Sequence, residues 1–305
     1  MRLVFRALLA CCLVSCLPSS ARAESPMFAE QPGHRGVLYS VHKGTSPTLY
    51  LFGTIHVSTS TQTPFSHAVK AALAQSRRVA LEADPSDIAK AMGAMLQMGR
   101  YPAGDSLRNH VPPAIMTDLQ ALFDKEHVPV SQFESMKLWA VPSLLAMAPT
   151  ARAGLDPAYG ADAFLAAWAH EHKVPIIEIE GWMFQLKLLS EGTDKDQLAL
   201  LEDELVEMKK KDLAVELKKL VNEWAAGDEK GLEKELLDDR DKSEAGRRFE
   251  KKLLDERNVG MADKAESYLQ LPGDTFFAVG SAHLLGNKGL VSLMKKRGYD
   301  VRPVR

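Results

Sequence analysis

Two histidines follow glycines at the same interval in two distant segments, each after a short apolar run. The first segment reads Thr48-Leu-Tyr-Leu-Phe-Gly-Thr-Ile-His56, and the second reads Thr275-Phe-Phe-Ala-Val-Gly-Ser-Ala-His283. Neutral imidazole is a good ligand for divalent metals, and it also acts as a general base near pH 7. We therefore expect His56 and His283 to form the core of a chemical site.

A glutamate is expected at the same place. Glu82 ends the short apolar segment Val79-Ala-Leu-Glu82. In parallel α/β sheets, ligands bind beyond the carboxyl ends of the strands, so Glu82 and the two histidines are predicted at one sheet edge. Two imidazoles and a carboxylate can bind one divalent metal and leave a position open for water, which predicts a Mn, Co or Zn site. The alternative is that each histidine only caps a loop.

Five further residues are expected to support this site. Gly53 and Gly280 end the two apolar strands, where a residue without a Cβ lets the backbone turn sharply. Arg257 is predicted to hold an oxyanion or to orient the glutamate, and a surface ion pair is its alternative. Glu180 ends another apolar strand and Asp162 begins a helical run. For both, the alternative is a local role at a helix N-terminus.

Composition and missing motifs exclude several function classes. The chain has 305 residues, of which 38 are Lys or Arg and 40 are Asp or Glu, a balance that gives no reason to expect a nucleic-acid partner. The three cysteines all lie within the first 16 residues, so the rest of the chain has no thiol nucleophile and no thiolate metal site. His-Glu-x-x-His, Gly-x-Ser-x-Gly, P-loop and Gly-x-Gly-x-x-Gly motifs are all missing.

The N-terminus has the features of a secretory signal peptide. Residues 1–23 combine a positive start, an apolar run over 7–17 and the small-residue sequence Ala21-Arg-Ala23. The apolar run is too short for a permanent membrane span, so we expect cleavage and a periplasmic or secreted protein. The alternative is a lipoprotein, because Leu13-Val-Ser-Cys16 resembles a lipobox and would place a lipid anchor on Cys16. A retained N-terminal anchor is the least favoured interpretation, and no membrane span is expected elsewhere.

The elements that must position these residues repeat one pattern. A strand, a loop, a helix and a strand follow each other over 48–83 and again over 275–304, which is typical of parallel α/β units. We predict an α/β fold in which two related βαβ-type halves form a mixed or parallel sheet core, with a large helical insertion between them. The expected strands are 37–42, 48–53, 78–83, 176–180, 275–280 and 299–304. The expected helices outside the long charged region 194–270 are 65–76, 85–100, 111–127, 131–148 with an interruption at Pro142, 161–172 and 288–297.

The helical insertion includes a long charged region. Residues 194–270 are rich in Leu, Glu, Lys and Asp with helical periodicity, and they predict amphipathic helices broken near Gly227 and Gly246. Their charge runs are expected to be solvated faces. We expect residues 24–305 to form a single domain that contains this region.

The motifs, taken in order along the chain, resemble those of the TraB/GumN family, to which the Tiki proteins are related. Each motif is weak alone, and their order and spacing carry the resemblance. They are Leu51-Phe-Gly-Thr-Ile-His-Val57, Leu81-Glu-Ala-Asp84, Tyr159-Gly-Ala-Asp162, Ile179-Glu180 with Gln185, Trp224-Ala-Ala-Gly-Asp228, Glu256-Arg-Asn-Val-Gly-Met-Ala262 and Phe277-Ala-Val-Gly-Ser-Ala-His-Leu284 with Gly286.

The resemblance implies paired α/β halves around a shared site. Animal Tiki members are regarded as metal-dependent proteases that use the Gly-x-x-His pair and a glutamate. Carried over, this places His56, Glu82 and His283 in the site, with Arg257 in support. Related folds also include haem-binding proteins and esterases.

Three functions from different classes follow. The favoured one is a secreted or periplasmic metal-dependent hydrolase that acts on a peptide or protein substrate. The second is a non-catalytic protein that binds haem, metal or a signalling peptide in the same pocket. The third is a protein-interaction module that works through the helical region 194–270.

Overall fold

A single mixed sheet forms the centre of the molecule. The computed structural model describes residues 36–59, 65–237 and 243–305, so the expected signal peptide and Cys16 lie outside the described residues. Within the described residues, six strands pair in the order β4-β3-β5-β2-β1-β6. Their bounds are β1 (Val37–His42), β2 (Leu49–Thr54), β3 (Arg78–Leu81), β4 (Ile176–Glu178), β5 (Thr275–Gly280) and β6 (Asp300–Pro303).

The strand register brings the ends of three strands to one edge. β5 lies between β2 and β3 and is parallel to both, and β3 is also parallel to β4. Thr54 pairs with Gly280, and Leu81 pairs with Ala278. The residues that follow β2, β3 and β5 therefore share one edge of the sheet. On the other side of β2, strand β1 is antiparallel to both β2 and β6.

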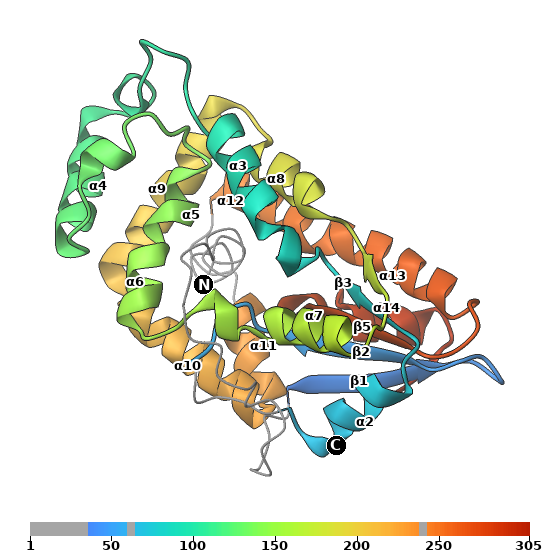
Figure 1. Cartoon of the computed structure of the whole chain (residues 1–305). Coiled ribbons are helices and arrows are strands. Elements are labelled where there is room, and N and C mark those ends of the chain that lie inside the picture. Colours follow the sequence, from blue (N-terminus) through green and yellow to red (C-terminus); the bar gives the residue numbers. More distant parts are fainter. Residues whose placement is uncertain (1–35, 60–64, 238–242) are drawn as a thin grey trace.

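Two crossover connections, from β2 to β3 and from β5 to β6, overlap in the strand order of this sheet. The chain passes from β2 through α2 (His67–Gln75) to β3, and from β5 through α14 (Leu290–Lys296) to β6. In the sheet order these crossings run in opposite directions, so right-handed connections place their helices on opposite faces. Figure 1 shows α2 below the strands and α14 above them. The expected α/β fold with two related βαβ-type halves is confirmed.

The apolar runs predicted as strands are the buried centre of the core. All six residues of β5 are buried, as expected for a parallel strand covered on both faces. Phe52, Phe276 and Phe277 are fully buried. The ring of Phe52 also meets the ring of Trp224 from the helical insertion, at 6.2 Å between centroids. The sheet and the helices thus share one hydrophobic core.

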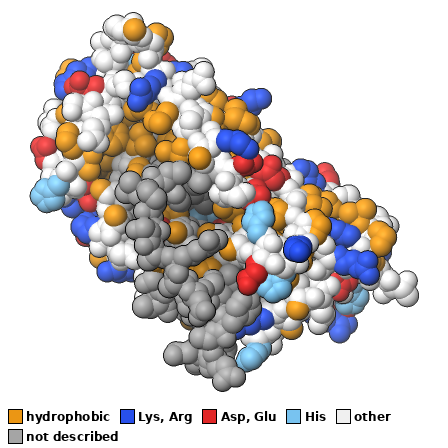
Figure 2. Space-filling view, viewed as in Figure 1, with side chains coloured by type: hydrophobic (Ala, Val, Ile, Leu, Met, Phe, Trp, Pro, Cys, Tyr) orange, Lys and Arg blue, Asp and Glu red, His pale blue; other side chains and the backbone are white. Residues whose placement is uncertain are grey.

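Apart from strand β4, the chain between β3 and β5 is mostly helical, and Figure 1 shows these helices arching away from the sheet edge. Figure 2 shows positive and negative side chains interspersed over the visible face. None of the helices in the described part of the chain has the length and apolar character needed to cross a membrane. Their bounds are α3 (Ile88–Met98), α4 (Pro113–Lys125), α5 (Val141–Leu145), α6 (Met147–Arg152), α7 (Ala161–Glu171), α8 (Trp182–Ser190), α9 (Asp194–Lys210), α10 (Leu213–Ala226), α11 (Glu229–Leu237), α12 (Glu244–Glu250), a π-helical segment (Lys251–Glu256) and α13 (Arg257–Tyr268).

The breaks in the region 194–270 were predicted only in part. α10 ends at Gly227, which has a positive φ of 68° that suits glycine. The break expected near Gly246 matches a helix boundary, because α12 begins at Glu244, two residues before the glycine. Ser243 is the N-cap of α12, and its hydroxyl accepts a hydrogen bond from the Gly246 amide. A further break was missed at Asp212, whose carboxylate caps α10 in the same way.

Candidate active site

Glu82 joins the end of β3 to the end of β5. It follows Leu81, the last residue of β3, and is 5% exposed. Its Oε1 accepts a hydrogen bond from the Gly280 amide at 2.7 Å, and its Oε2 accepts one from Gln185 Nε2 at 2.9 Å. Arg257 Nη2 lies 2.5 Å from Oε2. Both carboxylate oxygens are therefore held in place by groups from three other elements.

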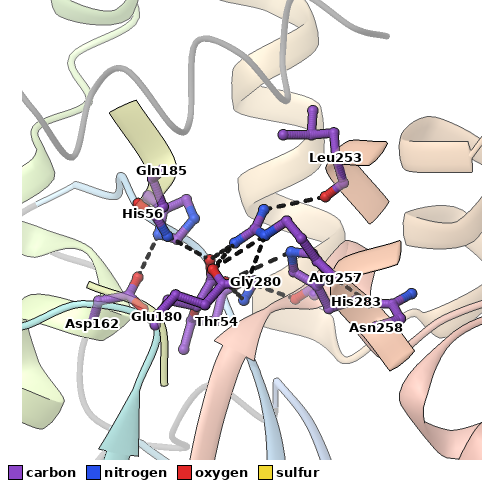
Figure 3. A network of polar contacts seen from close by, with 12 residues as sticks. Thr54, His56, Asp162, Glu180, Gln185, Leu253, Arg257, Asn258, Gly280 and His283 are labelled. Carbon is purple, nitrogen blue, oxygen red and sulfur yellow. Dashed lines mark hydrogen bonds and ion pairs between the residues drawn. The ribbon is translucent and has the colours of Figure 1, made fainter. Parts of the chain in front are cut away.

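The two predicted histidines are both oriented through Nδ1, as Figure 3 shows. His56 Nδ1 lies 2.7 Å from Asp162 Oδ2, and His283 Nδ1 lies 2.6 Å from Asn258 Oδ1. Because both partners are acceptors, Nδ1 carries the hydrogen and Nε2 keeps the lone pair. His283 Nε2 is 3.9 Å from Glu82 Oε1. The structure brings these predicted residues to one place.

Gly280 lies at the point where these groups converge. A methyl group on its Cα would lie 3.4 Å from Glu82 Oε1, 3.5 Å from His56 Nε2 and 3.9 Å from His283 Cδ2. Glycine at this position keeps that space open. Both histidines therefore face the same small volume beside the carboxylate, which argues against the interpretation that each only caps a loop.

Gly53, the matching glycine of the first segment, has a different role. A methyl group there would lie 2.8 Å from Ser281 Oγ and 3.2 Å from Ser281 Cα. The Ser281 hydroxyl donates to the Thr54 carbonyl at 2.8 Å. Gly53 therefore allows the ends of β2 and β5 to approach closely, and it does not border the space between the histidines.

Asp162 reaches His56 because the start of α7 docks against the loop after β2. The Ala161 amide donates to the Ile55 carbonyl at 2.8 Å. A methyl group on Gly160 would lie 2.3 Å from the His56 carbonyl oxygen, so this approach needs glycine. Asp162 lies in the first turn of the helix, but its carboxylate is turned to the imidazole. The purely local helix role is therefore wrong.

Arg257 is buried and pairs with two carboxylates. It is 4% exposed, which excludes the surface ion pair considered as its alternative. Nη2 lies 2.5 Å from Glu82 and 2.7 Å from Glu180, and Nη1 donates to the Leu253 carbonyl at 3.2 Å. The residue begins α13 directly after the π-helical segment Lys251–Glu256, a type of distortion that is frequent at functional sites.

The charges around Arg257 favour ionised Glu82. Burial alone would raise the pKa of Glu82, but the Arg257 charge, the two imidazoles and the Gly280 amide lower it to about 2. Burial raises the pKa of Glu180, and the nearby Glu82 charge adds to this while Arg257 opposes it. Glu82 is thus a carboxylate at neutral pH, firmly paired with the guanidinium.

His283 is held neutral. It is 1% exposed, and burial together with the Arg257 charge lowers its pKa to about 3, although Glu82 acts in the opposite direction. At neutral pH the ring therefore offers the lone pair of Nε2 to its surroundings. It does not add a positive charge to the site.

The site fits a divalent metal in the chemistry of its donors. Its side chains are two imidazoles and a carboxylate, and each histidine is oriented through Nδ1, as metal-binding histidines usually are. Among the described residues, however, no group of three His, Cys, Asp or Glu side chains lies close enough together to hold an ion. The Arg257 guanidinium beside Glu82 also competes with a cation for the carboxylate.

Sequence reasoning missed three residues of the site. Gln185 donates to Glu82 from α8, and Asn258 accepts from His283 at the start of α13. Trp224 is 3% exposed, and its indole donates to the Gly53 carbonyl at 2.8 Å. Each belongs to a motif of the family resemblance. Gln185 is an amide in a mostly apolar helical run, which is a signal of burial that does not identify its partner, whereas Asn258 and Trp224 lie beside charged residues and gave no such signal.

Comparison with known proteins supports the family resemblance. The model of the TraB/PrgY/gumN family matches residues 37–303. The chain is 25% identical over 246 residues to the uncharacterized protein YbaP of Escherichia coli K12, and equally to YbaP of Shigella flexneri. In both cases the matched stretch covers 81% of this chain and 87% of the relative. A stretch of 59 residues is 41% identical to a metalloprotease TIKI homolog from Nematostella vectensis, covering 19% of this chain and 12% of that protein. No solved structure gives a significant match.

Proposed function

This chain belongs to the TraB/PrgY/gumN family, and we propose that it is a metal-dependent hydrolase that cleaves peptide bonds outside the cytoplasm. One observation carries the proposal. His56 Nε2, Glu82 Oε1 and the ring of His283 surround the small space beside Gly280. The short similarity to a TIKI metalloprotease homolog is in accord with it.

The residues of the chain can hold and activate a water molecule in this space. His56 Nε2 and Glu82 Oε1 both border it. His56 Nε2 can accept a proton from a water placed there, whereas Glu82, whose pKa is lowered to about 2, is suited to accept a hydrogen bond from that water. The Asp162 carboxylate fixes the tautomer and the orientation of His56. It also favours the imidazolium that forms once the ring has taken a proton.

Arg257 acts as a positioning residue. Its Nε and Nη2 donate to Glu180 and Glu82, and its Nη1 donates to the Leu253 carbonyl. With its donors directed at these partners, it keeps Glu82 ionised and fixed in orientation. This favours orientation of the glutamate over the oxyanion role that was considered with it.

A divalent ion would be held by His56, Glu82 and His283. Mn, Co or Zn bound there would polarise the scissile carbonyl and lower the pKa of a bound water. The buried His283 suits such a role in its charge state, because a histidine must be neutral to bind a metal and this ring is neutral at neutral pH.

The test compares metal content and peptide turnover in the mature protein, residues 24–305. We expect about one metal ion per wild-type chain, loss of the metal in a His56→Ala/His283→Ala double variant, and loss of turnover in excess chelator. A His42→Ala/His67→Ala double variant is the matched control, because both of these histidines lie outside the site. Full turnover in excess chelator would overturn the metal dependence.

The non-catalytic alternative predicts a different outcome in the same experiment. A protein that binds peptide, metal or haem and cleaves no peptide would be a binding protein of this family. Haem binding would appear as a Soret absorption band on titration, and its dependence on His56 or His283 would place the haem in this pocket.

We also propose that residues 1–23 direct export and are then removed. The apolar run and the small residues before Glu24 support this, and the mass of the mature protein tests it. A mature chain that begins at Glu24 is the expected result. A lipid-modified chain that begins at Cys16 would show the lipoprotein alternative instead.

A further inference from the structure

A small cavity lies beside the space between the two histidines. Gly280 and His56 line this cavity, and both also border the space next to Glu82 Oε1. The part of the cavity that the centre of a water molecule can occupy is about 20 Å³. By this measure a cavity needs about 10–15 Å³ to hold one water. The cavity therefore has room for a single water molecule next to the proposed reaction centre.

Most of the cavity wall is apolar and comes from the helical insertion. Leu220 and Trp224 of α10 and Leu232 and Leu236 of α11 line it, and each of the four is at most 6% exposed. The Trp224 indole already donates its hydrogen to the Gly53 carbonyl. Because apolar cavities stay dry, the polar atoms in the rest of the wall decide whether a water binds.

One polar atom in this wall has no partner among the described residues. Thr54 ends β2 and is 2% exposed, and its hydroxyl forms no hydrogen bond within the described part of the chain. Buried hydroxyls are normally hydrogen-bonded, and leaving one unpaired costs free energy. Since Thr54 lines the cavity, its hydroxyl indicates a ligand that lies there.

A second hydroxyl in the wall can bind the same ligand. Ser281 lines the cavity, and its hydroxyl donates to the Thr54 carbonyl at 2.8 Å, so its oxygen can only accept from a further group. A water molecule can accept from the Thr54 hydroxyl and donate to Ser281. Buried waters make about two to four hydrogen bonds, and these hydroxyls supply two of them. None of the described residues in the wall is Lys, Arg, Asp or Glu, which disfavours an ion as the ligand.

We propose that this cavity holds one water molecule on the Thr54 hydroxyl, and that this water is the one used in hydrolysis. The inference rests on the proposed hydrolase function. Thr54 is then a positioning residue, which holds the water beside His56 in the same cavity. In the reaction the water oxygen bonds to the carbonyl carbon, and one of its protons passes to His56. The C–N bond breaks, and the leaving amine takes that proton.

A high-resolution crystal structure of the mature protein, residues 24–305, tests for the water directly. In the wild type we expect an ordered oxygen within hydrogen-bond distance of Thr54 Oγ1 and Ser281 Oγ. Thr54→Val keeps the shape of the side chain but has no hydroxyl, so this oxygen should be lost. A wild-type cavity without an ordered oxygen would overturn the inference.

Steady-state kinetics with a peptide substrate test whether hydrolysis uses this water. Thr54→Val should lower kcat about tenfold at unchanged KM, because the hydroxyl binds water and not substrate. Thr54→Ser keeps the hydroxyl and should stay within about threefold of wild type. If Thr54 only fills space, the order is reversed, because valine replaces its volume better than serine does. Thr150→Val is the matched control, since Thr150 is also buried and its hydroxyl donates to the Ala146 carbonyl.

The two proposals fail in distinguishable ways. If the water is found and the wild type cleaves no peptide, the hydrolase is refuted and only the one-water site stands. If the wild type cleaves peptides and folded Thr54→Val has the same kcat, the hydrolase stands and the positioning role of Thr54 is refuted.

Discussion

The two Gly-x-x-His segments have nearly the same sequence pattern and lie on neighbouring parallel strands, yet their histidines have different surroundings. The His56 side chain is 11% exposed and is bonded to a carboxylate, that of Asp162. The His283 side chain is 1% exposed and is bonded to an amide oxygen, that of Asn258. The repeated pattern thus determines where each ring lies, whereas the packed helices determine its electrostatic environment.

Under the proposed function, this difference gives the two histidines different roles. A carboxylate at Nδ1 stabilises a ring that takes up a proton at Nε2, so His56 suits proton transfer. An amide oxygen gives no such compensation of charge, and burial with the Arg257 charge lowers the pKa of His283 to about 3. His283 therefore suits a permanently neutral role, as a ligand or an acceptor.

The largest expected effect comes from Glu82, which lies between the two histidines. Glu82→Gln removes the charge that both rings share while keeping the size of the side chain. We expect kcat/KM for a peptide substrate to fall by about 10³-fold or more. Glu178→Gln is the matched control, since this glutamate ends the neighbouring strand β4 and is exposed. Activity within tenfold of wild type in the folded Glu82→Gln variant would contradict a centre shared by both halves.

Replacing the side chain that orients each histidine ring compares the two segments directly. Asp162→Asn removes the negative charge beside His56, and we expect kcat to fall about 100-fold. Asn258→Ala removes a neutral acceptor beside His283, and we expect a loss of about tenfold in activity or metal affinity. Steady-state kinetics with metal analysis measure both. Equal losses of kcat at unchanged metal content would refute the division of roles.

The sequence was sufficient for the sheet and for most of the site. The apolar runs that end in Gly53, Glu82 and Gly280 could be recognised because they are buried on both faces of a parallel sheet. Because ligands bind beyond the carboxyl ends of parallel strands, the residues that follow these runs were expected at one edge of the sheet. Glu82 and both histidines were found on this basis.

The remaining site residues depend on tertiary contacts that no local pattern contains. Asn258 and Gln185 are polar residues on buried helix faces, and only the packing of α13 and α8 against the sheet edge reveals their partners. The burial of Arg257 follows from the same packing.

Substitutions at Gly53 and Gly280 have smaller expected effects, and they separate a loss of stability from a loss of activity. Gly53→Ala places a methyl group against Ser281, including its backbone, so we expect a loss of about 1–3 kcal/mol in the free energy of unfolding. Gly280→Ala meets its neighbours only at ordinary contact distances, so stability should change little while activity falls, because the methyl group fills the space between the donors. Urea unfolding and peptide turnover separate the two effects. A Gly280→Ala variant that keeps full activity would show that the space is not used.

The smallest expected effect concerns acid stability, and it comes from His283. Its pKa is about 6.5 in the unfolded chain and about 3 in the folded protein. The unfolded state therefore binds more protons below pH 6.5, and the free energy of unfolding falls as the pH falls from about 6.5 towards 3. Between pH 7 and pH 5 this group alone should remove about 2 kcal/mol.

Urea unfolding of metal-free protein, in excess chelator, measures this pH dependence. The pH range 5–7 lies above 4.5, the ordinary pKa of the Glu82 carboxyl, so acid loss from that group does not yet contribute. The His283→Gln variant should be less stable at pH 7, but its stability should fall by about 2 kcal/mol less on going to pH 5. His42→Gln, a change at the sheet margin outside the site, should keep the steep wild-type slope. If His283→Gln has the wild-type slope, His283 takes up a proton in the folded protein and the contrast with His56 is lost.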